Sequence, residues 1–81
     1  MKKVEIKLTE PVEVNGERFE QLSIRAPRVR DLLMASKFDG SDEEKEVRIF
    51  ANLCEVPPEV VEELTIRDYQ QLQKAYQGFL S

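Results

Sequence analysis

The sequence contains no histidine, no tryptophan and a single cysteine, Cys54. Histidine is the commonest general base and a frequent metal ligand, so its absence removes the usual means of acid–base and zinc chemistry. One cysteine cannot form a disulfide within the chain, and the apolar neighbours Leu53 and Val56 offer no base to activate its thiol. We expect Cys54 to be a buried core residue, and we expect no enzyme activity, metal or cofactor.

Glycine is also scarce, with Gly16, Gly40 and Gly78 too far apart to form a phosphate-binding loop. No stretch approaches the roughly 20 apolar residues that cross a bilayer, and no apolar segment follows the first lysines as in a signal peptide. The formal net charge is −4, whereas nucleic-acid binding needs a clustered positive surface. We expect a cytoplasmic protein that binds neither membranes nor nucleic acid.

The composition that remains is that of a folded chain. Hydrophobic residues make up 41% and charged residues 35% of 81 residues, which predicts one globular domain over 1–81. A domain of this size buries a modest core and often gains stability by association. Protein partners are therefore expected, and self-association is one form they can take.

Apolar and polar residues alternate over the first fourteen positions, which indicates a strand with one buried face. The apolar set is Val4, Ile6, Leu8, Val12 and Val14. The Asn-Gly pair that follows is the strongest short hairpin signal, and the next strand carries its own apolar face. We predict an antiparallel hairpin over about 3–25.

Two loop geometries keep both apolar sets on one face of this hairpin. A three-residue loop, a type I turn plus bulge with Gly16 at positive φ, places Leu8 opposite Leu22 and Ile6 opposite Ile24. A two-residue Asn-Gly turn separates the two sets unless a bulge further along restores the phase. We expect the three-residue loop.

Helical patterns follow the hairpin, with boundary signals at their ends. Pro27 opens the first helix, Gly40 stops it, and Ser41 with Glu44 forms a capping box for the second. A lone hairpin is unstable in water, so helices must cover its apolar face. We predict an α+β fold in which three to four helices pack on one face of an N-terminal antiparallel hairpin. The expected helices span about 28–38, 41–55, 58–64 and 66–80.

The helices have wider apolar faces than one core stripe requires. The first carries Val29, Leu32 and Leu33 on its main face, with Met34 and Phe38 opposite. Either each helix packs against two neighbours, or part of this apolar surface is a groove for a partner helix. The candidate partner-binding residues are Met34, Phe38, Ile49, Phe50, Leu53, Tyr69, Tyr76 and Phe79.

A small basic patch in this acidic chain is formed by Arg25, Arg28 and Arg30, where the second strand leads into the first helix. One interpretation is a contact for an acidic partner segment. The other, which we favour, is ion pairing with Asp31 or with the acids near Ser41.

Six segments in this order carry a family resemblance. They are VEIKL at 4–8, PVEVNGE at 11–17, LSIRAPRVRDL at 22–32, LCEVPPE at 53–59, LTIRDY at 64–69 and GFL at 78–80. With the glutamine-containing last helix they cover almost the whole chain, which resembles the Mu-like phage tail assembly chaperone family. The link at Arg28 and Arg30 is more basic than the resemblance leads us to expect.

The resemblance implies a non-enzymatic protein that acts in the cytoplasm of the bacterial host during phage or prophage tail assembly. Such proteins are thought to bind the long tape measure protein, keep it soluble and help tail tube subunits assemble around it. The tape measure protein, and also the tail tube protein, are the implied partners. The family is absent from the mature virion, and the resemblance implies no catalytic residues.

Two other functions remain open. The last two predicted helices resemble a helix-turn-helix. On that interpretation the chain is a small nucleic-acid-binding regulator. Alternatively, the protein is a structural tail or head-completion subunit, which predicts that it is present in purified particles.

Overall fold

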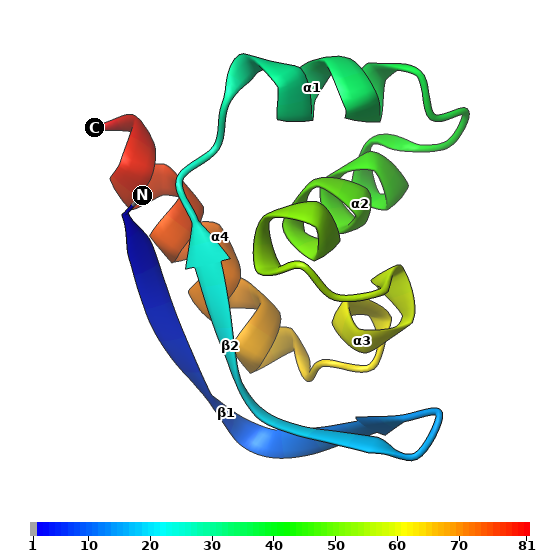
Figure 1. The fold of residues 1–81 in the computed structure, drawn as a ribbon, viewed down its shortest axis with the longest axis vertical. Helices are drawn as coiled ribbons and strands as arrows, with labels where there is room; N and C mark the ends of the chain where they lie inside the picture. The colour runs from blue at the N-terminus through cyan, green and yellow to red at the C-terminus, as the bar shows by residue number, and fades with distance from the viewer. Residues whose placement is uncertain (1) are drawn as a thin grey trace.

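The computed structural model describes residues 2–81, and its elements follow the predicted order. Strands β1 (Lys3–Val14) and β2 (Glu17–Arg25) form an antiparallel hairpin (Figure 1). The helices are α1 (Val29–Ser36), α2 (Asp42–Cys54), α3 (Pro58–Glu62) and α4 (Ile66–Leu80). The predicted α+β class, a hairpin followed by helices, is therefore confirmed.

The hairpin turn differs from the expected loop. Asn15 and Gly16 have φ values of 52° and 81°, and Val14 pairs with Glu17. Positive φ at both central residues defines a two-residue type I′ turn, whose twist matches that of the strands. The expected three-residue loop is wrong, whereas the positive φ of Gly16 is confirmed.

The phase of the apolar faces is restored further along, by an irregularity in β1. Pairing runs from Val12↔Phe19 directly to Lys7↔Gln21, so four residues of β1 oppose one residue of β2. This bulge changes the expected partners, and Ile6 lies opposite Leu22 instead of Ile24. The two-residue turn alone would place the two apolar sets on opposite faces of the hairpin. The bulge shifts β1 by an odd number of residues, which brings both sets back to the face that the helices cover.

The backbone groups released by the bulge are bound by a helix. Asp68, in the first turn of α4, accepts hydrogen bonds from the Thr9 N–H at 3.0 Å and from the Thr9 hydroxyl at 3.1 Å. The Glu10 N–H donates to the same carboxylate at 3.4 Å. Pro11 has no N–H to satisfy. The Asp68 side chain thus replaces the missing strand partner and fixes α4 against β1.

The buried apolar side chains form one cluster between the hairpin and the helices. Helices α2, α3 and α4 cover the same face of the hairpin, whereas α1 packs mainly on α2 (Figure 1). No helix in the part of the chain described is long and apolar enough to cross a membrane. The cluster comprises Ile6, Leu8, Val12, Leu22, Ile24, Phe50, Ala51, Leu53, Cys54, Val60, Val61, Leu64 and Leu72.

The orientation of α1 reverses the one expected from its apolar pattern. Val29, Leu32 and Leu33, its main apolar face, are 73%, 50% and 57% exposed. The buried residues are Asp31 and Ala35. The helix is turned this way because Asp31 makes several polar contacts on the inner side, and a carboxylate cannot be buried without them.

Candidate functional site

Asp31 is the polar centre that positions α1. Arg25 donates two hydrogen bonds to its carboxylate, at 2.8 and 3.0 Å, in a buried bidentate ion pair. The Asn52 side chain of α2 and the Arg28 backbone N–H each donate to it at 2.7 Å. The pKa of Asp31 is lowered, chiefly by the Arg25 hydrogen bonds, which outweigh the opposite effect of burial. Strand β2 and helices α1 and α2 thus meet at one carboxylate.

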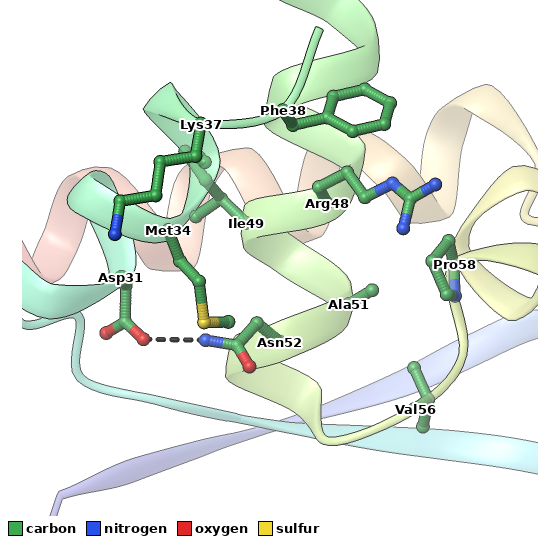
Figure 2. Close-up of a pocket in the computed structure, with 11 residues that line it drawn as sticks. Asp31, Met34, Lys37, Phe38, Arg48, Ile49, Ala51, Asn52, Val56 and Pro58 are labelled. Atoms are coloured by element: carbon green, nitrogen blue, oxygen red, sulfur yellow. Dashed lines mark hydrogen bonds between the residues drawn. The ribbon is translucent and has the colours of Figure 1, made fainter.

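A groove of about 400 Å³ lies between α1 and α2, next to this carboxylate (Figure 2). Its walls are mostly apolar, and the Asn52–Asp31 hydrogen bond closes one end. We call it the α1–α2 groove. Its lining residues are Asp31, Met34, Ala35, Lys37, Phe38, Arg48, Ile49, Ala51, Asn52, Val56 and Pro58.

Three of the predicted partner-binding residues line this groove. Met34 is 57% exposed on α1, Phe38 follows α1, and Ile49 lies on the facing side of α2. The Arg48 guanidinium lies over the Phe38 ring, 4.3 Å from its centroid, which is a cation–π contact. The structure therefore brings together residues from two separate predicted helices.

The other five candidates lie in or against the core. Phe50 and Leu53 are each 1% exposed. Tyr69 and Tyr76 are half-buried and pack on the Phe50 ring with centroid distances of 5.4 and 5.6 Å. Phe79 is half-buried against the same cluster. These side chains account for the wide apolar faces of α2 and α4 by packing against two neighbours.

The basic patch divides into two parts. Arg25 is 8% exposed and pairs with Asp31, which is the ion pairing that the sequence favoured. The pair is buried and therefore differs from an exposed ion pair, which contributes little to stability. Arg28 and Arg30 are exposed.

Of the exposed apolar residues of α1, the sequence analysis named Met34 as a partner-binding candidate but missed Val29, Leu32 and Leu33. Val29, Leu32 and Leu33 are exposed on one face of α1, and Met34 is exposed on the side next to the groove; we call these four residues the α1 surface. One signal in the sequence could have predicted this orientation. Asp31 follows Arg25 by six residues and lies on the opposite side of α1, and a buried ion pair between the two determines which side of the helix faces inward. The cations Lys37 and Arg48 beside the groove were also missed.

The thiol of Cys54 and possible metal ligands are the remaining candidates for chemistry. Burial raises the pKa of the Cys54 thiol to about 12, which keeps it protonated at neutral pH. Within residues 2–81, no three carboxylate or thiol side chains are placed to hold a metal ion. The geometry instead offers an apolar groove and an exposed apolar helix, which are features that bind another polypeptide.

The fold and the groove together define a small α+β protein with an apolar groove and an exposed apolar helix face. A family model described as "Phage tail assembly chaperone proteins, E, or 41 or 14" matches residues 5–81. The chain therefore belongs to this family of phage tail assembly chaperones. No curated protein and no solved structure gives a significant match.

Proposed function

We propose that this protein binds the tape measure protein of its phage and keeps it soluble while the tail tube assembles around it. The α1 surface is the observation that carries the proposal. Six large apolar side chains are exposed in residues 2–81, and four of them lie on this eight-residue helix. Scattered exposed apolar residues are normal, but a contiguous patch marks an interaction site. Membership of the family supplies the setting, assembly of a phage tail.

The α1 surface and the α1–α2 groove form one continuous binding region, because Met34 belongs to both. Such a region suits an amphipathic helix, whose apolar anchors recur every three or four residues. A tape measure protein is long and helical and offers many such segments. The net charge of −4 helps to keep the complex soluble. In this role the protein acts without catalysis in the host cytoplasm and is missing from the finished virion.

Co-expression with the tape measure protein encoded by the same phage tests the proposal. We expect the tape measure protein to remain soluble and to co-purify with the wild-type chain. Replacing Leu32 and Leu33 together by glutamine should abolish both effects. Folding should be unaffected, because both side chains are already half exposed.

The matched control replaces Ile66 and Leu80, which are exposed apolar residues of α4, by glutamine. This variant loses as much apolar surface and should still solubilise the tape measure protein. Equal loss in both variants would show that the α1 surface has no special role. Failure of the wild-type chain to bind or solubilise the partner would overturn the proposal itself.

Among the contacts of residues 2–81, none favours either of the two alternatives. The exposed side of α4 presents two cations, Arg67 and Lys74, among glutamines, which is a small positive surface for phosphate groups. A structural subunit remains distinguishable by experiment. Its presence in purified tails, at a stoichiometry matching a tail component, would favour that function over the chaperone.

A further inference from the structure

The α1–α2 groove is apolar inside and positively charged at its edge. Lys37, at the end of α1, and Arg48, on α2, both line it, and both are exposed (Figure 2). The ion pairs within residues 2–81 are Arg18–Glu20 and Arg25–Asp31, so neither groove cation takes part in one. Among the residues that line the groove, positive side chains therefore outnumber acidic ones, in a protein of net charge −4.

The groove lining contains one carboxylate, whereas Glu43, Glu44 and Glu62 lie with Arg48 around a neighbouring hollow. Asp31 is the acidic residue among those lining the groove in the described chain, and Arg25 neutralises it at 2.8 Å. Glu44 interacts electrostatically with Arg48, but its carboxylate accepts the Ser41 N–H of the α2 capping box at 2.8 Å. Neither Lys37 nor Arg48 forms an ion pair with these carboxylates in residues 2–81, so both can pair with carboxylates supplied by a partner.

We propose that the α1–α2 groove binds an amphipathic helical segment whose acidic side chains, about one turn from its apolar anchors, pair with Lys37 and Arg48. The apolar anchors contact Met34, Phe38 and Ile49, and the cations select the charge of the segment. The inference rests on the proposed function for the identity of the partner, since it specifies which segments of the tape measure protein are bound. The groove inference can be tested without knowing the partner, because synthetic peptides replace it.

Charge argues against a second copy of this chain as the occupant. In such a dimer the exposed α1 of one copy would enter the groove of the other. The free charges of that helix and its end, Arg28, Arg30 and Lys37, are all positive, because Asp31 is neutralised internally. Like charges placed together at an interface are unfavourable. An acidic helix has the complementary charge.

Two synthetic helical peptides of about 15 residues test the groove directly. Both carry leucines at positions i, i+4 and i+7, and one has flanking glutamates where the other has lysines. We expect the protein to bind the acidic peptide at least about tenfold more tightly, as measured by fluorescence anisotropy. The preference should weaken at high salt, because exposed ion pairs are screened. Equal affinities, or no binding of either peptide, would overturn the inference.

Reversing the charges of Lys37 and Arg48 tests whether these two residues cause the preference for the acidic peptide. The double variant Lys37→Glu/Arg48→Glu should lose it and favour the lysine peptide. The matched control, Arg67→Glu/Lys74→Glu on the exposed side of α4, makes the same change in net charge and should retain the preference for the acidic peptide. Thermal unfolding confirms that each variant folds, and Lys37→Gln/Arg48→Gln replaces the reversal if it does not. An unchanged preference in the groove variant would also overturn the inference.

Binding of the tape measure protein separates this inference from the proposed function. If the full-length partner co-purifies equally with wild type and with Lys37→Glu/Arg48→Glu, the chaperone function stands and the acidic selectivity is wrong. If the partner does not bind but the protein prefers the acidic peptide, the groove chemistry stands and the proposed function falls. A dimer that dissociates when Lys37 and Arg48 are reversed would instead identify a second copy as the occupant, contrary to the inference.

Discussion

The Asp68 carboxylate shows how one side chain can determine the shape of a whole strand. It is fully buried and accepts hydrogen bonds from the Thr9 and Glu10 backbone and from the Thr9 hydroxyl. Burial by itself would raise the pKa of Asp68, but these hydrogen bonds lower it below its ordinary value. Sequence reasoning identified the start of α4 at Thr65, whose hydroxyl does accept the Asp68 N–H. It could not identify the bond to β1, because that bond joins residues 59 positions apart.

Replacing Asp68 by asparagine should reduce the free energy of unfolding by about 2–3 kcal/mol. The amide keeps one acceptor oxygen but places an NH₂ group against the N–H donors of the bulge. Urea denaturation measures the loss. The control is Asp42→Asn in the first turn of α2, where the exposed side chain should change stability by less than about 0.5 kcal/mol. An equal loss in both variants would mean that the bulge does not depend on this carboxylate.

At the scale of the elements, local signals were sufficient for order and boundaries but not for orientation. The Asn-Gly turn and the Ser41 capping box are local patterns, and both were recognised. The face that α1 turns inward depends on Arg25 and Asn52, which lie on two other elements. Apolar periodicity therefore predicted α1 correctly as a helix and its inner face incorrectly.

The buried ion pair that orients α1 gives a direct prediction. Asp31→Ala leaves the Arg25 guanidinium buried without its partner and should cost about 3 kcal/mol or more of unfolding free energy. The double variant Arg25→Met/Asp31→Leu removes both charges and should recover at least half of that loss. Urea denaturation of the single and double variants provides the comparison. No recovery in the double variant would show that α1 is held by packing and not by the pair.

The C-terminus of α2 is a second place where an element departs from local preference. Glu55 ends the helix with φ 58° and ψ 44°, a left-handed conformation that glycine adopts more readily. Glu55→Gly should therefore raise the unfolding free energy by about 0.5–1 kcal/mol, as measured by thermal or urea unfolding. The matched control, Glu59→Gly within α3, should destabilise by a similar amount. Destabilisation by Glu55→Gly would indicate that the Glu55 charge near Arg25 matters more than the backbone.

At the scale of the whole molecule, the core was predictable and the exposure of the main apolar face of α1 was not. Apolar residues at regular spacing in the strands and in α2 and α4 do form the core, because burying them is the main driving force for folding. Exposed apolar residues carry the same sequence signal as buried ones. Hydrophobicity alone cannot separate Phe50 from Val29, so Phe50, which is 1% exposed, was a partner-binding candidate and Val29, which is 73% exposed, was not. The exposure of Val29 follows only from the tertiary contacts of Asp31.

Asp31 and Asp68 also couple the stability of the whole fold to pH. Both have folded-state pKa values below the ordinary value of about 3.9. Below about pH 5 these two side chains therefore bind more protons in the unfolded chain than in the folded one. The stability that these carboxylates contribute is fully present above the unfolded pKa and is lost as the pH falls through the folded pKa values. One hydrophobic cluster joins both sites, so we expect the loss to appear as a single cooperative transition.

Urea denaturation from about pH 7 to about pH 3 should show this loss as a falling free energy of unfolding. The Asp68→Asn variant has one fewer carboxylate of lowered pKa, so its curve should fall less steeply than that of the wild type. The difference between the two proteins should therefore be largest near pH 7 and should shrink toward pH 3. A difference between wild type and Asp68→Asn that stays constant with pH would mean that the Asp68 charge does not stabilise the fold, and that only the shape of its side chain matters.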